Sequence, residues 1–141
     1  MSVFKPSDRA TSSYTFALFC HDDVYSIHGL WPEWKAPRYP VSCHPEKHFY
    51  MQKINSIEDR LNKHWYDRSG KNKHFWKHEY DKHGTCTHLT ELEYFSKALD
   101  LFDLAMKHGN KWLKQWKLGK NQLHIPVDLN FKFMKKKLLH F

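Results

Sequence analysis

The stretch FWKHEYDKHGTC, from Phe75 to Cys86, concentrates titratable side chains in one short segment. We predict a helix over residues 73–83 that ends at Gly84. At about 100° per residue, this helix places four titratable residues on one stripe beside phenylalanine and tryptophan: His78, Glu79, Lys82 and His83. Such a stripe is typical of a lined cleft. For this segment alone, an exposed face rich in histidine remains the alternative.

Upstream, SIHGLWPEW (Ser26–Trp34) places His28 between an apolar residue and a Gly-Leu-Trp-Pro sequence that we interpret as a turn. The apolar, aromatic segment Tyr14–Cys20 predicts a buried strand, and the alternating segment Val24–His28 predicts a second strand. Residues 21–23 predict a tight turn between them.

Downstream, the clearest helix of the chain begins with a capping box formed by Thr90 and Glu93, and we expect it to end at Gly109. Its apolar residues recur at helical spacing: Leu92, Phe95, Leu99, Phe102 and Met106. Residues 46–65 also show roughly helical spacing, whereas the proline-rich residues 33–46 predict a loop. Residues 124–141 predict a short strand followed by a basic helix.

The length of 141 residues predicts one domain over residues 1–141, and the charge composition predicts a polyanionic partner. Lysine and arginine exceed aspartate and glutamate by 23 to 15, giving a net charge of +8, and 12 histidines add charge at acid pH. A merely soluble basic protein is equally compatible with charge alone. The first twenty residues show no signal peptide, and no apolar run is long enough to span a membrane.

Two kinds of chemistry compete with acid–base catalysis at the histidine-rich helix. A zinc site is disfavoured because His78 and His83 are five residues apart and diverge, although His28 could add a third ligand. A thiol nucleophile is disfavoured because Cys86 follows the helix, where the helix dipole would not lower its pKa. We therefore expect neither a metal nor a cofactor.

Acid–base catalysis by two histidines, one from each segment, suits the cleavage of RNA. One imidazole would take the proton of the 2′-hydroxyl, and a protonated one would give a proton to the departing 5′ oxygen. A nearby cation would neutralise the charge that builds on phosphorus.

The motifs IHGLWP (Ile27–Pro32) and FWKHEYDKHGTC closely resemble the two active-site signatures of the ribonuclease T2 family. The resemblance covers about residues 14–105. It implies an α+β fold in which an antiparallel central sheet packs against several helices, with a shortened C-terminal part. The chain departs from the family pattern at Tyr80, where tryptophan is usual.

The resemblance assigns catalytic roles residue by residue. It implies that His28 is the general acid and that His83 is the general base. It implies further that Glu79 and Lys82 stabilise the pentacoordinate phosphorus, and that His78 holds the phosphate.

The resemblance also implies a base-binding site at Trp31, Glu33 and Tyr39. Cys43 and Cys86 match the family's disulfide, which leaves Cys20, the third cysteine, as a free thiol.

We therefore expect an endoribonuclease that cleaves single-stranded RNA by transphosphorylation to 2′,3′-cyclic phosphate ends, without a metal. The alternative is a non-catalytic RNA- or partner-binding protein on a reduced ribonuclease scaffold. The expected partner is RNA, with no membrane, and the expected state is a monomer. The resemblance implies an extracellular or endolysosomal location, which the missing signal peptide leaves open.

Overall fold

A long β-hairpin forms the centre of the protein. The structure, a computed structural model, describes residues 11–34 and 40–135. Strands β1 (Thr11–His21) and β2 (Val24–Trp34) pair antiparallel. Both residues of the turn between them have positive φ, 52° at Asp22 and 62° at Asp23, as a two-residue type I′ turn requires. The predicted strands and turn are confirmed.

The expected turn after His28 is wrong, because β2 continues to Trp34. Pro32 lies within this strand and pairs with Tyr14 of β1. A proline is tolerated there since β2 is the edge strand of the described sheet, where a missing backbone N–H breaks no ladder.

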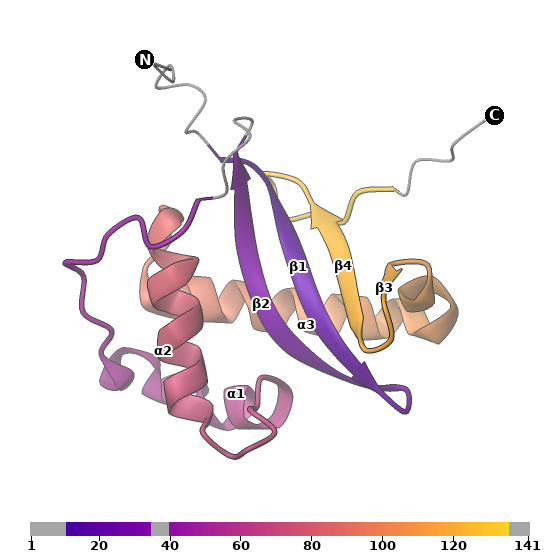
Figure 1. Ribbon diagram of the computed structural model, residues 1–141, viewed down its shortest axis with the longest axis horizontal. Helices are drawn as coiled ribbons and strands as arrows, with labels where there is room; N and C mark the ends of the chain where they lie inside the picture. The colour runs from indigo at the N-terminus through magenta and orange to yellow at the C-terminus, as the bar shows by residue number, and fades with distance from the viewer. Residues whose placement is uncertain (1–10, 35–39, 136–141) are drawn as a thin grey trace.

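Two further strands complete the sheet. β4 (Gln122–Val127) pairs antiparallel with β1, and the short β3 (Lys117–Leu118) pairs with β4. The strand order is β2-β1-β4-β3 (Figure 1). The predicted C-terminal strand is confirmed. Residues 128–135 form turns and one isolated bridge instead of a helix, and residues 136–141 lie outside the described part.

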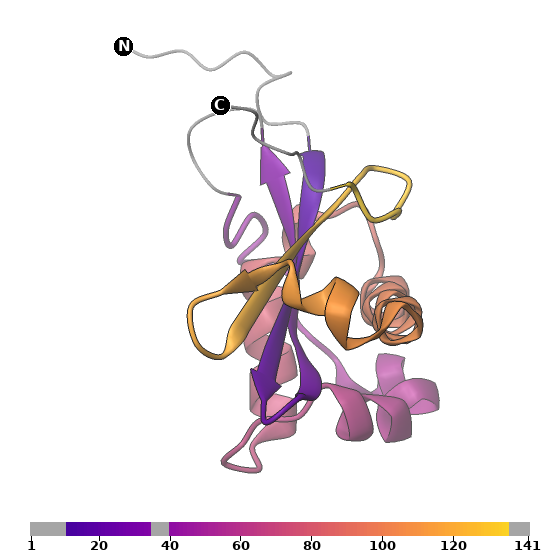
Figure 2. The same ribbon diagram turned by 90° about the vertical axis from the view of Figure 1, so that its right-hand side faces the viewer.

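Helix α3 (Glu91–Lys114) crosses one face of the sheet (Figures 1 and 2). It begins with the predicted capping box, in which Thr90 accepts from the backbone of Glu93 and Glu93 accepts from that of Thr90. Gly109, at φ 83°, interrupts the helix instead of ending it. Most of the predicted apolar face is buried, but Leu92 is exposed.

The remaining helices lie around the β2 side of the sheet. The helical pattern of residues 46–65 becomes a 3-10 helix η2 (Met51–Ile57) followed by α1 (Glu58–His64). Helix α2 (Asn72–Lys82) runs beside β2 (Figure 1) and leads into the 3-10 helix η3 (Gly84–Cys86). Antiparallel strands and helices together confirm the α+β class. No helix in the described ranges has the length and apolar character to cross a membrane.

The core lies between the sheet and α3 and extends to α2. Trp76 and Tyr80 of α2 are buried there, and the Tyr80 ring packs against Tyr94 and Phe95 of α3. The Tyr94 hydroxyl donates a 2.7 Å hydrogen bond to the carbonyl of Leu30. This burial fixes α2 against the edge of the sheet and leaves its polar stripe facing away from the core.

Candidate active site

A β-bulge in β2 directs His28 away from the core. Ala17 pairs with Gly29, whereas the next residue, Leu18, pairs with Ile27, so His28 is the extra residue. Bulges of this kind re-aim a side chain next to functional sites. Here the bulge lets Ile27 remain fully buried while its neighbour His28 faces the other side of the sheet.

That other side holds a cleft of about 550 Å³ between the sheet and α2. Every predicted catalytic, phosphate and base-site residue among the described residues lines it: His28, Trp31, Glu33, His78, Glu79, Lys82 and His83. Tyr39 lies outside the described residues. The cleft also contains residues that the sequence analysis missed: Thr15, Pro32, Pro40, Val41 and His124.

A hydrogen bond joins the two walls of the cleft. The indole Nε1 of Trp31 donates to Oε1 of Glu79 at 2.9 Å. Gly29 makes room for this bond, because a Cβ there would lie 2.1 Å from that oxygen and 2.2 Å from the indole nitrogen. The glycine of the first motif is thus required by the close approach of two other side chains.

The two catalytic candidates flank Trp31. The His83 ring stacks on the indole with centroids 5.1 Å apart, and the His28 ring meets the indole edgewise at 4.9 Å. His28 also stacks on Phe19 at 4.3 Å. The Nδ1 atoms of both histidines are buried and have no hydrogen-bond partner among the described residues. The Nε2 atoms are therefore the ones available to a ligand in the cleft.

Burial determines the protonation of these groups. It lowers the pKa of His28 to about 4 and that of His83 to about 3, because an imidazolium loses its hydration in the cleft. The charges of Lys82 and His78 lower both pKa values further. The Glu79 side chain is almost completely buried, and burial raises its pKa to about 7 despite the hydrogen bond from Trp31.

Helix α2 presents its stripe as the sequence predicts. His78 and Lys82 of this stripe are exposed, and His78 Nε2 lies 4.0 Å from Oε2 of Glu79. The chain then turns tightly at Gly84, where a Cβ would lie 2.4 Å from the Tyr80 ring. This turn places His83 at the end of the helix and inside the cleft.

A side chain of β1 holds the predicted base-site residue Glu33 in place. Its Oε1 accepts a 3.0 Å hydrogen bond from the Thr15 hydroxyl. Burial raises the pKa of this carboxyl, and the Thr15 hydrogen bond opposes that shift. The second carboxyl oxygen of Glu33 accepts no hydrogen bond from the described residues, which leaves it open to a ligand as far as they are concerned.

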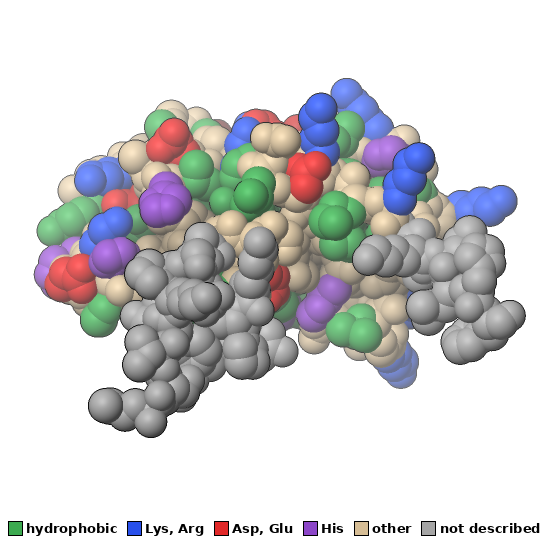
Figure 3. All heavy atoms as spheres, turned by 90° about the horizontal axis from the view of Figure 1, so that it is seen from above, with side chains coloured by type: hydrophobic (Ala, Val, Ile, Leu, Met, Phe, Trp, Pro, Cys, Tyr) green, Lys and Arg blue, Asp and Glu red, His purple; other side chains and the backbone are tan. Residues whose placement is uncertain are grey.

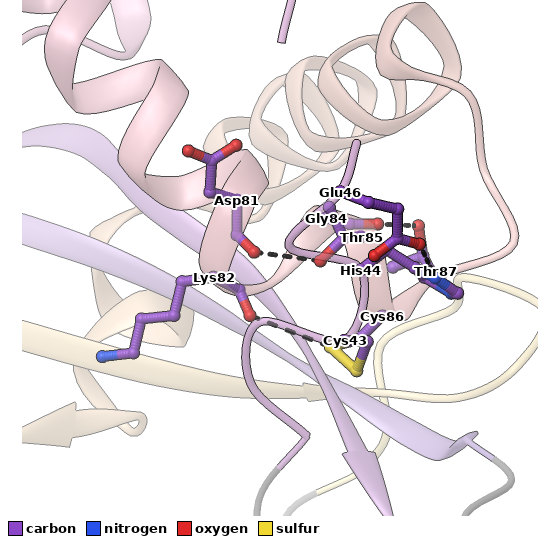
Figure 4. Close-up of a disulfide and its surroundings, with 9 residues drawn as sticks. All are labelled: Cys43, His44, Glu46, Asp81, Lys82, Gly84, Thr85, Cys86 and Thr87. Carbon is purple, nitrogen blue, oxygen red and sulfur yellow. Dashed lines mark hydrogen bonds and ion pairs between the residues drawn. A yellow bond between two sulfur atoms is a disulfide. The ribbon is translucent and has the colours of Figure 1, made fainter. Parts of the chain in front are cut away.

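The predicted disulfide links Cys43 to Cys86, and Cys20 is free. Figure 4 shows the bond beside the end of α2, below the Lys82 carbonyl. The backbone N–H of Ser42 donates to that carbonyl at 2.8 Å. The disulfide and this hydrogen bond together attach the segment with Pro40 and Val41, two cleft residues, to the end of α2.

His124 belongs to neither of the two sequence motifs, and the sequence gives it no role in the site. It lies on β4, lines the cleft and meets the Trp31 indole edgewise at 5.3 Å. The alternation of its strand could have predicted that it faces away from the buried Leu123 and Ile125. No sequence pattern shows that β4 pairs with β1 next to the cleft.

The sequence of this chain is similar to those of known ribonucleases. The family model described as Ribonuclease T2 family matches residues 7–122. The Caenorhabditis elegans ribonuclease T2 protein rnst-2 is 45% identical over 87 residues, which are 56% of this chain and 31% of that protein. Ribonuclease S-2 of Pyrus pyrifolia is 30% identical over 115 residues, 76% of this chain and 51% of that protein. The chain thus spans about a third to a half of the length of these curated relatives.

Solved structures share the fold. RNase NT in complex with 5′-AMP superposes with a TM-score of 0.69 at 21% identity, covering 94% of this chain and 93% of that chain. Human RNase T2 superposes with a TM-score of 0.68 at 17% identity, covering 87% and 89%. Because the family match extends over most of the chain and includes both histidine motifs, this protein belongs to the Ribonuclease T2 family.

Proposed function

We propose that this protein is an endoribonuclease that cleaves single-stranded RNA by transphosphorylation to 2′,3′-cyclic phosphate ends, without a metal. The observation that carries the proposal is the placement of two buried imidazoles, His28 and His83, on either side of Trp31 in one cleft. Family membership and the likeness to RNase NT in complex with 5′-AMP support it.

The two histidines divide the proton transfers. Neutral His83 accepts the proton of the 2′-hydroxyl, whose oxygen attacks phosphorus. Protonated His28 donates its proton to the 5′ oxygen as the bond to phosphorus breaks. His83 has the lower pKa of the two. When the pair carries one proton, that proton therefore lies mainly on His28, which leaves His83 neutral as the mechanism requires.

Charge on phosphorus is balanced from α2. Lys82 and His78 supply cations at the exposed side of the cleft. Below pH 7 the buried Glu79 is largely protonated, so its carboxyl can donate a hydrogen bond to a phosphoryl oxygen. An ionised carboxylate would instead repel the phosphate, so the raised pKa suits the role proposed for this residue.

The base of the attacking nucleotide is assigned to the end of the cleft formed by Trp31 and Glu33. The indole offers an aromatic contact, and the free carboxyl oxygen of Glu33 can accept from an amino or imino group of the base. No single basic patch is needed for this mode of binding. Figure 3 shows cationic and anionic side chains interspersed on the face seen from above.

The test is cleavage of a single-stranded RNA oligonucleotide at pH 4–5 in excess EDTA, with products identified by mass spectrometry. We expect 2′,3′-cyclic phosphate ends and no cleavage of the matched DNA. His28→Ala and His83→Ala should each lower turnover by about two to four orders of magnitude. His74→Ala, an exposed histidine of α2 that does not line the cleft, is the control.

Three outcomes would overturn the proposal. Activity that EDTA abolishes and zinc restores would indicate a metal-bound nucleophile. Unchanged rates in both histidine variants would place the chemistry elsewhere. RNA binding without cleavage at any pH would favour the non-catalytic binding protein.

A further inference from the structure

Strands β2, β1 and β4 lie side by side in the sheet that forms one side of the cleft. In this row of the sheet, Gly29 of β2 pairs with Ala17 of β1, and Ala17 pairs with His124 of β4. Ala17 is fully buried, and the side chains of Trp31 and Glu79 occupy the space next to Gly29. The long side chain that this row contributes to the cleft is therefore that of His124. The imidazole can therefore reach across the row to the Trp31 ring.

Two contacts hold His124 in this position. Its backbone N–H donates to the carbonyl of Trp116 at 3.1 Å, and its Nε2 lies 3.3 Å from Oε1 of Gln122 on the same strand. The ring is half-buried and meets the indole edgewise. A side chain fixed in this way is oriented toward the cleft before any ligand arrives.

The surroundings of His124 are rich in basic side chains. His28 of β2 and three residues of the α2 wall face the same cleft: His78, Lys82 and His83. The acidic groups there are Glu33, which is bonded to Thr15, and Glu79, which is bonded to Trp31. No carboxylate in the described part of the chain lies within ion-pair distance of His124. A protonated His124 therefore has no anionic partner among the described residues.

His124 lies at about the same position along the strands as His28, the proposed general acid. Along the strands, Thr15 and Trp31 form one row of the cleft, and the row with Ala17 and His124 comes next, beside the bulged His28. If the attacking nucleotide's base lies at Trp31 and Glu33, the phosphodiester lies over the His28–His124 row. The charge of His124 acts directly on His28 and lowers its pKa.

We propose that His124 is a fourth substrate-contacting imidazole, besides His28, His78 and His83, which in its protonated form binds the phosphodiester from the β4 side, opposite Lys82. The inference rests on the proposed function for the position of the RNA strand in the cleft. The binding role of His124, however, does not require turnover. The family match ends at residue 122, so it assigns no role to His124. Burial lowers the pKa of free His124, and a bound phosphate would raise it again.

The test measures binding without cleavage. Fluorescence anisotropy follows a labelled single-stranded DNA octanucleotide, which lacks the attacking 2′-hydroxyl, at pH 4.5 and 7.5 over a range of salt concentrations. His124→Gln keeps hydrogen-bonding capacity but cannot become cationic, and His124→Asn is a second variant in case the first fails to fold. His74→Gln removes one imidazole from outside the cleft as the matched control.

At pH 4.5 we expect His124→Gln to weaken binding about tenfold, the usual range for a hydrogen bond to a charged group. The slope of log Kd against log salt concentration should fall by about 0.7, the value for one phosphate contact on a single strand. At pH 7.5 the variant and the wild type should bind alike. A merely structural role would give a loss that does not depend on pH or salt.

Such a pH- and salt-independent loss, an unchanged slope at pH 4.5, or no binding by the wild type would overturn the inference. The same experiments distinguish a failure of the proposed function from a failure of the role of His124. If the octanucleotide results are as expected but RNA is not cleaved, His124 keeps its role and the ribonuclease proposal falls. If RNA is cleaved and the variants bind DNA like the wild type, only the role of His124 falls.

Discussion

Trp31 on β2 and Glu79 on α2 are joined by a hydrogen bond of 2.9 Å that crosses the cleft from one wall to the other. The same indole stacks on His83 and touches the edge of His28. A single aromatic side chain therefore holds the proposed acid, the proposed base and the buried carboxyl in fixed relative positions.

Variants that break the Trp31–Glu79 hydrogen bond should lower kcat, and their effects should not add. Trp31→Phe removes the donor, and Gly29→Ala introduces a Cβ that would lie 2.1 Å from the Glu79 oxygen. We expect each change to lower kcat by about 10- to 100-fold, because misplacement by about 1 Å can have effects of that size. Since both act on one bond, the double variant should be little worse than the more severe single variant.

Kinetics of the two single variants and the double variant check this expectation. Trp112→Phe, on α3 outside the cleft lining, controls for the loss of an indole. Fully additive losses would show that Gly29 and Trp31 act independently.

The rate should depend on pH in the acid range. The profile of kcat/KM reports the free enzyme, and it should fall above about pH 4 as His28 loses its proton and below about pH 3 as His83 gains one. The kcat profile should lie at higher pH because a bound phosphodiester favours protonated histidines. Steady-state kinetics across pH 2.5–8 measures both profiles.

Lys82 contributes to these low pKa values, so Lys82→Gln should move both limbs of the kcat/KM profile to higher pH. Lys77→Gln, whose ammonium pairs with Asp81 and does not line the cleft, is the control. A rate that climbs steadily through pH 8 would contradict the two-histidine mechanism.

The buried Glu79 should make stability depend on pH in the opposite sense to the histidines. Its pKa in the folded protein, about 7, lies above the ordinary value of 4.5, so the stability it contributes is present below pH 4.5 and is lost as the pH rises through 7. A shift of this size corresponds to about 3 kcal/mol. Glu79→Gln should therefore unfold with nearly wild-type free energy at pH 4.5 and be more stable than wild type at pH 8.

Urea unfolding of both proteins at the two pH values gives this difference, and the histidine contributions cancel because both proteins retain them. Glu58→Gln on α1, which removes a partly exposed carboxyl, should show a much smaller change between the two pH values. A constant difference between Glu79→Gln and wild type would mean that Glu79 ionises normally.

The disulfide should stabilise both the fold and the cleft. It closes a loop of 43 sequence steps, for which loop-closure entropy predicts about 4 kcal/mol. Replacing Cys43 and Cys86 together by alanine should lower the unfolding free energy by about that amount. It should also raise KM, because Pro40 and Val41 lose their attachment to α2.

Chemical denaturation and RNA kinetics of this double variant provide the measurement. Cys20→Ala, which removes the free thiol of β1, is the matched control and should leave KM unchanged. Wild-type KM in the disulfide variant would show that the cleft does not depend on the bond.

The sequence by itself determined the main elements and most of the cleft. The hairpin, the helix over residues 73–83 and the capped helix at Thr90 follow from local signals: alternation, turn residues, capping and helical spacing. The stripe of α2 could be predicted because neighbours on a helix face are fixed by helical geometry. The family resemblance then brought His28 to the same site and paired Cys43 with Cys86.

Only the tertiary structure decided what depends on contacts between distant segments. The pairing of β4 with β1 adds His124 to the cleft, and the bulge at His28 puts this residue on the same side of the sheet as Trp31, although strand alternation alone would place residues three positions apart on opposite sides. The raised pKa of Glu79 and the lowered pKa values of His28 and His83 arise from burial by β2 and α2 together. Burial is a property of the assembled molecule, because desolvation depends on every segment that excludes water from a group, and no local pattern records it.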